Sequence, residues 1–462
     1  MAKFSRVLGM FLVALWGVGV YAAGGKDDDK ARDPGVRGGT SGAGEHIAGL
    51  TDREIEFFDA GKEEFDEDDD VEEGLGPRMN LGGCGACHKK PAVGGTSPAV
   101  NPQVAFADEG ADEFPSYVLF SGGYASPRGP IREVRFKRHR DGSPDGGVHN
   151  TATITGREGA DRCRLKLDDF QGEFDAHNVT FRIPTPLFGA GLLEQIPDAE
   201  ITRNQAADGD FKKWYGIGGR PNKIRVSGET NNNGNDGTIA RFGWKAQNKS
   251  LLLFSGEAYN VEMGITNELF QNEREESKKC QFTKVPNTVF DTEAEDVLEA
   301  MSPIEKFAFF QRFLAPPTPY SPKASEKPSI DKGRGLFNST GCALCHTPML
   351  RTGNSMVDAL RNKPANLFSD LLLHNMGPGL ADEISQGQAE GDEFRTAPLW
   401  GLGQRIFFMH DGRSDDLIKA IQAHKSAGNS RYRASEANNV IDNYNRLREA
   451  EKQDLLNFLR SL

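Results

Sequence analysis

The sequence predicts a mainly α-helical chain made of two related units, with irregular and β-rich insertions in the first half. The pentapeptide Cys-x-x-Cys-His occurs twice, at residues 84–88 and 342–346. Residues 182–191 resemble residues 395–403, and each of these segments follows one pentapeptide by dozens of residues. Residues 436–462 carry apolar side chains at helical spacing, which predicts a helix that closes the second unit.

The first residues predict an export signal. Lys3 and Arg6 give a positive start, the mostly apolar run 7–21 follows, and small residues suited to cleavage begin at Ala22. The apolar run is shorter than the roughly 20 residues of a membrane helix. We therefore expect residues 1–22 to be a cleaved signal peptide, the mature chain to have no membrane span, and its location to be periplasmic. An uncleaved anchor is the alternative.

The two pentapeptides predict covalently bound haem. Two thiols at this spacing add across the two vinyl groups of one haem, and the imidazole of the next residue reaches the iron. The residues expected to attach two haem c groups are Cys84, Cys87, Cys342 and Cys345. His88 and His346 are the expected iron ligands. A zinc site would need further ligands near each pair, and a thioredoxin-like pair has no use for the histidine.

Changes in composition divide the rest of the chain. The stretch after residue 22 is rich in Gly, Asp and Lys, which predicts flexibility, and a Pro- and Ser-rich linker precedes the second pentapeptide. The expected segments are a flexible stretch at 23–50, an N-terminal cytochrome c-like haem domain with long insertions at 51–315, the linker at 316–328, and a C-terminal cytochrome c-like haem domain at 329–462.

Charge and the two remaining cysteines limit the class further. The 462 residues carry a net charge of −12, which argues against nucleic acid or an anionic membrane as partner. Cys163 and Cys280 lie outside the pentapeptides. In an oxidising compartment they are expected to form a disulfide, with two unpaired buried thiols as the alternative.

The order of the motifs resembles the bacterial di-haem cytochrome c peroxidases. It is more similar to the di-haem oxidoreductase family that is also described as thiol oxidoreductase-like, and residues 244–266 are distantly similar to rubber oxygenases. The resemblance is carried by the two pentapeptides, the Arg-x-Pro-Thr-Pro segment at Arg182, the Trp244 element, the Phe-Arg-Thr-Ala-Pro-Leu run at 394–399 and the His-Asp-Gly motif at His410. It spans most of the chain after about residue 50.

The resemblance implies a peroxidase-like enzyme. Such an enzyme takes electrons from a donor protein at the C-terminal haem and reduces a small-molecule oxidant, hydrogen peroxide or oxygen, at a reactive N-terminal haem. The relatives also hold Ca²⁺ between the haems, so Ca²⁺ is a further candidate cofactor. Two alternatives stay open: haem-dependent oxygenation or oxidation of an organic or protein substrate, and a non-enzymatic di-haem electron carrier.

The resemblance places the distal ligand of the second haem in the run after the His-Asp-Gly motif, where counting reaches His424. The residues before His424 have an apolar spacing that fits a helix packed on a haem. Ligation by His346 and His424 would give a lower reduction potential than a histidine–methionine pair. A surface histidine at a helix end is the alternative. His374 and Met376 are competing ligands, for which a structural role is the preferred interpretation.

The internal repeat places Ala258 where the second half has His424, so the first haem is expected to have an open distal face. Glu262 matches the acidic residue that the peroxidases use to move a proton between the peroxide oxygens, and Tyr259 lies near it in the sequence. Trp244 matches the tryptophan between the two haems of the relatives. Each has a plain alternative, as a surface glutamate, a packing tyrosine or a buried core tryptophan. Other candidates to close the first haem are His139, His149 and His177.

Overall fold

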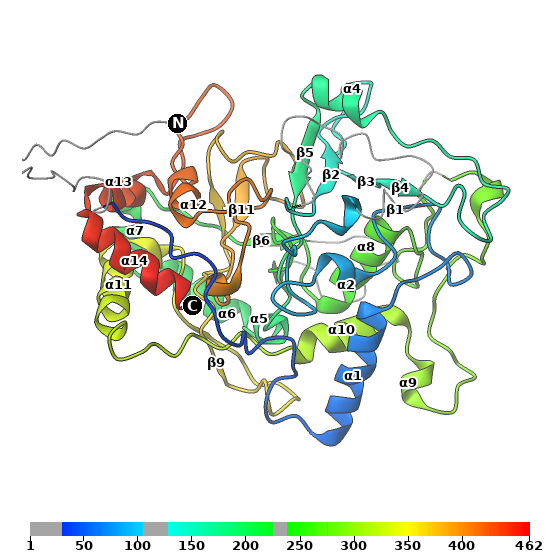
Figure 1. The fold of residues 1–462 in the computed structure, drawn as a ribbon, viewed down its shortest axis with the longest axis horizontal. Coiled ribbons are helices and arrows are strands. Elements are labelled where there is room, and N and C mark those ends of the chain that lie inside the picture. Colours follow the sequence, from blue (N-terminus) through cyan, green and yellow to red (C-terminus); the bar gives the residue numbers. More distant parts are fainter. Residues whose placement is uncertain (1–29, 105–127, 225–237, 275) are drawn as a thin grey trace, which may run out of the picture.

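The computed structural model of the chain describes residues 30–104, 128–224, 238–274 and 276–462. The expected signal peptide lies outside the described residues. The described chain mixes helices with short strands, which pair in antiparallel sheets of two or three strands (Figure 1). The expected mainly α class therefore holds only in part, because strands occur in the second half as well as in the insertions of the first.

The elements follow one another in two series. In the first half they are α1 (Asp52–Asp66), β1 (Arg78–Met79), α2 (Cys84–Cys87), β2 (Glu133–Phe136), β3 (Val148–His149), β4 (Ala152–Thr153), α4 (Phe170–Asp175), β5 (Val179–Arg182), α5 (Ala190–Glu194), α6 (Asp198–Ala206), α7 (Gly209–Tyr215), β6 (Asn222–Ile224), β7 (Thr238–Ala240), α8 (Leu251–Met263), η2 (Lys278–Cys280), α9 (Val297–Ala300) and α10 (Pro303–Phe313). In the second half they are α11 (Lys327–Thr340), η3 (Cys342–Leu344), β8 (Leu350–Arg351), β9 (Pro364–Ala365), β10 (Leu373–Asn375), β11 (Glu393–Arg395), η4 (Leu402–Gln404), α12 (Leu417–Ala423), α13 (Asn438–Arg446) and α14 (Glu449–Arg460).

In each half, the helix before the pentapeptide packs against the helix near the end of that half. α1 packs on α10, and α11 packs on α14. Glycines make the approach close: a Cβ at Gly61 of α1 would lie 2.2 Å from the Lys306 carbonyl oxygen of α10. A Cβ at Gly333 of α11 would lie 2.0 Å from the Asp454 carbonyl oxygen of α14. Only glycine tolerates these contacts.

Aromatic pairs one turn further along repeat this packing. The ring centroids of Phe65 and Phe310 lie 4.9 Å apart, and those of Phe337 and Phe458 lie 5.4 Å apart. Phe65 and Phe337 each lie one helical turn after the glycine of the close contact. Phe310 and Phe458 each lie one turn after the residue whose carbonyl oxygen that glycine approaches. The rings therefore lie on the same helix faces as the close contacts. The two halves therefore pack their first and last helices in the same way.

A second repeated feature is a loop that leads into a helix. It is closed by an isolated antiparallel bridge in each half, Phe242 with Asn248 and Phe408 with Ser414. α8 follows the first loop and α12 follows the second at the same spacing. Trp244 and His410 therefore occupy the same place in the two loops, and Ala258 and His424 the same place along the chain after them. This agrees with the internal repeat expected from the sequence.

The chain closes with two helices rather than the one expected over 436–462. α13 ends at Arg446, because the next residue, Leu447, has an extended backbone with φ −63° and ψ 145°. α14 then begins with a capping box between Arg448 and Glu451. The predicted apolar stripe is nevertheless buried on both helices, for example at Tyr444 and Leu455.

The described part of the segment expected to be flexible is bonded to the rest of the chain. Asp33 forms an ion pair of 2.7 Å with Arg460 in α14, and both side chains are buried. The Ile47 amide donates to the Phe313 carbonyl at 2.7 Å. Residues 30–50 therefore run along both halves of the molecule rather than standing apart from them.

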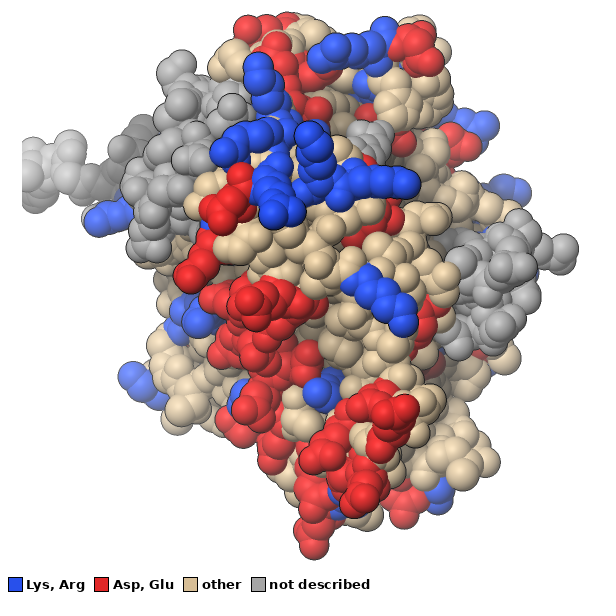
Figure 2. All heavy atoms as spheres, turned by 90° about the vertical axis from the view of Figure 1, so that its right-hand side faces the viewer, with Lys and Arg blue, Asp and Glu red and all other residues tan. Residues whose placement is uncertain are grey.

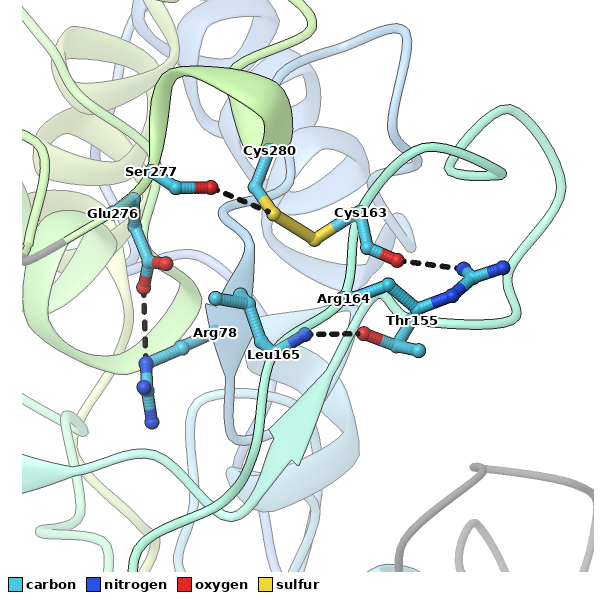
Figure 3. The surroundings of a disulfide bond; sticks show 8 residues. All are labelled: Arg78, Thr155, Cys163, Arg164, Leu165, Glu276, Ser277 and Cys280. Atoms are coloured by element: carbon cyan, nitrogen blue, oxygen red, sulfur yellow. Dashed lines mark hydrogen bonds and ion pairs between the residues drawn. A yellow bond between two sulfur atoms is a disulfide. The ribbon is translucent and has the colours of Figure 1, made fainter.

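Cys163 and Cys280 form a disulfide, which confirms the pairing expected from the sequence. Their Cα atoms are 4.7 Å apart, although 117 residues separate them in the sequence. Figure 3 shows the bond between η2 and the loop that follows β4, next to the ion pair of Arg78 with Glu276. The bond joins the two segments within the core of the first half, because both cysteines belong to the same cluster of buried side chains.

The surface charge is uneven. Figure 2 shows one end of the molecule, where basic side chains gather in the upper part and acidic side chains spread below them. Figure 1 places α4 at the top of this end and α1 and α9 at the bottom. Basic and acidic side chains are therefore separated on this face, although the chain as a whole carries a net charge of −12.

Candidate functional site

The first pentapeptide lines a cavity in the N-terminal half, here named the N-cavity. Cys84 and Cys87, at the two ends of α2, and His88 all contribute to its wall. The Nδ1–H of His88 donates to the Gly95 carbonyl at 2.9 Å. This bond leaves Nε2 as the ring nitrogen with the lone pair, which is how proximal histidines are commonly held in metal sites.

The second pentapeptide repeats this arrangement in a second cavity, the C-cavity, lined by Cys342, Cys345 and His346. The Nδ1–H of His346 donates to the Phe368 carbonyl at 3.0 Å. Burial lowers the pKa of both His88 and His346 to about 4, so both rings are neutral at pH 7.

The donor sets fit the predicted cofactor. All four pentapeptide cysteines are free thiols rather than disulfides. A neutral imidazole is the form that binds iron, and a cavity beside each thiol pair provides space for an apolar ring. The side chains present therefore fit two haems, each attached by two thioether bonds and held by one histidine.

Three further imidazoles line the C-cavity, those of His374, His410 and His424. His424 follows α12, lines the C-cavity, and donates its Nδ1–H to the Ala420 carbonyl at 2.8 Å. Its Nε2 is thus prepared for a ligand in the same way as that of His346. The competing His374 lines the cavity too, but its ring nitrogens contact Glu436 at 2.7 Å and Asp370 at 2.9 Å. The second competitor, Met376, also lines the C-cavity.

The N-cavity holds one imidazole only. All nine histidines of the chain lie in its described part, and His88 alone lines the N-cavity. Of the other candidates, His149 is bonded to Asp145 and Asp168 at 3.0 and 2.9 Å. Ala258 lines the N-cavity, as the internal repeat predicts.

Charged side chains from β2, β5 and α8 line the N-cavity: Glu133, Arg135, Arg182, Glu257 and Glu262. Glu133 and Arg182 are paired residues of the β2–β5 ladder, so their side chains share one face of the sheet. Glu133 also forms an ion pair with Arg135. The C-cavity, in contrast, is lined mainly by apolar side chains. Polar chemistry is therefore concentrated at the first pentapeptide.

Glu262 is the carboxyl group of this cluster that the sequence singles out. Burial raises its pKa well above the usual range, the Glu133 carboxylate adds to the rise, and Arg135 opposes it. Burial also raises the pKa of Glu257, whose carboxylate accepts a hydrogen bond from Asn248. The environment of Glu262 thus favours its protonated form, as a proton donor requires.

Tyr259 lies in the wall of the N-cavity and is 2% exposed. Its hydroxyl donates to Asp69 at 2.7 Å, and burial raises the pKa of the Asp69 carboxyl to about 7. Tyr259 therefore contacts the cavity with its ring while its hydroxyl is engaged elsewhere.

Trp244 lines both cavities. Its Nε1–H donates to the Ile183 carbonyl at 2.9 Å, which fixes the plane of the ring. Its centroid lies 6.4 Å from that of His410, which faces the C-cavity. Trp244 therefore lies between the two cavities, and its place between two haems stays a prediction.

Sequence reasoning missed three charged residues of the N-cavity, Glu133, Arg135 and Glu257. The first two alternate along β2, and Glu257 lies close to Glu262 on α8. Alternation in a strand is a visible signal, but it does not show which cavity a face will line, and residues five apart on a helix do not have the three- or four-residue spacing of one face. Among the residues that the structure describes, no three His, Cys, Asp or Glu side chains are grouped to hold a metal ion, and no helix is long and apolar enough to cross a membrane.

Two cavities, each with a haem-attachment motif, define a di-haem protein, and comparison with known families gives its class. The model of the family described as "Di-haem oxidoreductase, putative peroxidase" matches residues 168–462. The chain therefore belongs to this di-haem oxidoreductase family. The first pentapeptide precedes the matched range.

Two solved structures are similar to parts of the chain. A MauG-like protein associated with microbial copper homeostasis is 17% identical, with a TM-score of 0.29, over 60% of this chain and 90% of that chain. Hydrazine synthase of Kuenenia stuttgartiensis is 20% identical, with a TM-score of 0.23. This match covers 36% of this chain and only 56% of the hydrazine synthase chain. No curated protein matches the chain.

Proposed function

We propose that this di-haem oxidoreductase is a c-type peroxidase whose N-cavity is the reactive site and whose C-cavity is the site of electron entry. One observation carries the proposal. A single imidazole, His88, lines the N-cavity, whereas His346 and His424 both line the C-cavity. An iron with two protein ligands passes electrons, while one with an open face can bind an oxidant.

The N-cavity supplies the groups that a peroxidase needs. A haem iron bound there supplies the redox chemistry. The Glu262 carboxyl holds a proton and can give it to the departing oxygen of hydrogen peroxide. Ala258, which lines the same cavity, has a methyl side chain that cannot ligate iron, so it would leave one face of the iron open to the oxidant. Arg135, buried in the same wall, provides positive charge where negative charge develops on oxygen.

The C-cavity and Trp244 serve electron supply. His346 and His424 would hold the iron, and each ring is oriented by a hydrogen bond to a backbone carbonyl. Trp244, in contact with both cavities, offers an aromatic path between them. The donor is expected to be a protein that reaches the C-terminal half.

Two cytochrome c-like domains, at 51–315 and 329–462, are part of this proposal. The support is the repeated packing of α1 on α10 and of α11 on α14, together with the repeated loop before α8 and α12. On this proposal each half supplies most of the wall around its own pentapeptide.

A periplasmic location is proposed as well. The disulfide of Cys163 with Cys280 supports it, since such bonds persist in oxidising compartments. Removing residues 1–22 should abolish covalent haem, because c-type attachment takes place after export. Denaturing gels stained for haem would measure this, and full haem content in the truncated chain would contradict it.

The direct test is electron paramagnetic resonance of the oxidised holoprotein during titration with cyanide. The proposal expects a high-spin signal that converts to low spin with cyanide, together with one low-spin signal that does not respond. Two low-spin signals that stay unchanged in both oxidised and half-reduced protein would overturn it and leave an electron carrier. A responsive site without peroxide consumption would favour oxidation of an organic substrate instead.

A further inference from the structure

Two arginines interrupt the mainly apolar wall of the C-cavity. Arg395 and Arg405 both line it and are 8% and 9% exposed. Arg395 is held by the backbone, because its Nε donates to the Gly243 carbonyl at 3.0 Å and a terminal nitrogen to the Thr396 carbonyl at 3.1 Å. The Arg405 guanidinium has no hydrogen bond or ion pair with any residue that the structure describes.

A buried guanidinium without an anion is unfavourable. Burial lowers the pKa of Arg405 to about 10 and that of Arg395 to about 10, so both remain cations at pH 7. No described carboxylate forms an ion pair with either of them. Glu436, the acidic residue of the C-cavity wall, is bonded to His374 at 2.7 Å and to the Gly218 amide at 2.9 Å. Asp370 acts electrostatically on Arg395, whereas Arg405 has no counter-charge among the described residues of the chain.

We propose that Arg405, assisted by Arg395, binds the propionate carboxylates of the haem attached at Cys342 and Cys345. The inference rests on the proposed di-haem function. Haem carries two carboxylates, and a guanidinium binds a carboxylate through two parallel hydrogen bonds. Arg405 also lines a small adjoining cavity next to Trp244, so the ion pair would be formed in the protein interior.

A positive charge at this place has a measurable effect on the cofactor. It disfavours the oxidised state, in which the iron carries an additional positive charge. Arg405→Gln is therefore expected to shift the midpoint potential of the low-spin, cyanide-insensitive haem to more negative values. The ratio of reduced to oxidised C-terminal haem, at the wild-type midpoint, should fall about five- to tenfold.

The test uses full-length holoprotein and two readouts, spectroelectrochemical titration and the propionate bending bands of the resonance Raman spectrum. Arg405→Lys keeps the charge but not the paired geometry, so it should shift the Raman bands with a smaller change in potential. Arg361→Gln, which removes an exposed arginine of the same half, is the charge control and should change neither.

The inference would be overturned if Arg405→Gln kept the wild-type midpoint potential and Raman bands. It would also be overturned if Arg361→Gln changed both readouts as much as Arg405→Gln does. If Arg405→Gln fails to mature, unchanged bands in Arg405→Lys would overturn it. These readouts report on the C-terminal haem alone. A shift in them stands even where the N-terminal haem proves unreactive, so this inference and the proposed function can fail separately.

Discussion

Single residues distinguish the two cavities. At the position where the second half carries His424, the first half carries Ala258, and the N-cavity instead contains Glu262 with Glu133 and Arg135. Proton transfer and charge stabilisation require such groups beside the reacting atoms. The functional difference that we propose between the halves would thus depend on a few side chains within the same arrangement of helices.

Glu262→Gln should reduce peroxide turnover by about 10²- to 10⁴-fold, because an amide cannot give up a proton as a carboxyl does. Wild-type turnover should fall as the pH rises through the raised pKa of Glu262, since the carboxyl then loses the proton it donates. Stopped-flow measurement over a range of pH would show both effects.

Glu257→Gln, on the same helix and in the same cavity, is the comparison for this variant. Its carboxylate is an acceptor for Asn248, a role that glutamine can keep. A loss in Glu257→Gln equal to that in Glu262→Gln would argue against a specific role of Glu262. Cyanide binding should be retained in both variants.

His424→Ala should convert the low-spin C-terminal haem to a high-spin form, and His424→Met should raise its midpoint potential because thioether ligation favours reduced iron. Absorption spectra and redox titration would measure these changes. His374→Gln is the matched comparison in the same cavity, where the ring is bonded to two carboxylates. A low-spin haem in His424→Ala, with loss of that state in His374→Gln, would transfer the ligand role to His374.

At the scale of elements, the two helix pairs depend on close backbone contact. Gly333→Ala places a methyl group 2.0 Å from the Asp454 carbonyl oxygen, which is shorter than any allowed contact. We expect α11 and α14 to separate slightly, with a loss of about 1–3 kcal/mol in the free energy of unfolding. Denaturant titration of the holoprotein would measure the loss.

Gly335 provides the control on the same helix, since a Cβ there would have no atom within 4 Å. Gly335→Ala should leave stability unchanged or raise it by up to about 1 kcal/mol, because alanine favours a helix more than glycine does. Equal loss in both variants would show that the effect arises from helix propensity and not from the contact with α14.

The sequence was informative where chemistry requires fixed local spacing. The pentapeptides, the repeat around Trp244 and the place of Glu262 shortly after Ala258 could be predicted, because each depends on residues that are close together in the chain. Glu133 and Arg405 could not, since their positions follow from the β2–β5 register and from the closure of the second half around its cavity. Likewise, the glycine contacts of α1 and α11 become meaningful only once their partner helices are known.

At the scale of the whole molecule, a buried charge network joins the halves. Asp382 of the second half pairs with Arg182 at 2.6 Å and with Lys245 at 3.1 Å, and all three side chains are nearly or fully inaccessible. Lys245 also donates to the carbonyls of Glu390 and Glu393, at 2.9 Å each. The network fixes the half that contains Trp244 against the half that contains the C-cavity.

Asp382→Asn should lower the free energy of unfolding by about 3–5 kcal/mol, because it leaves two buried cations without their counter-charge. Thermal and denaturant unfolding of the holoprotein would measure this. Asp358→Asn, which removes an 80% exposed partner of Arg361, should change stability by less than about 1 kcal/mol. A similar small loss in Asp382→Asn would show that the network contributes little.

The sharing of cavity walls constrains how the protein is made. Trp244 from the first half lines the C-cavity, and Tyr215 belongs to a cluster that packs on Cys342 and Cys345. If haem is joined to these thiols as we propose, the ligase that attaches it would need access to them before these side chains have packed. Attachment would then precede tertiary closure, so that α14 docks on α11 around a haem that is already bound, and the cofactor would serve as a template for the folding of the second half.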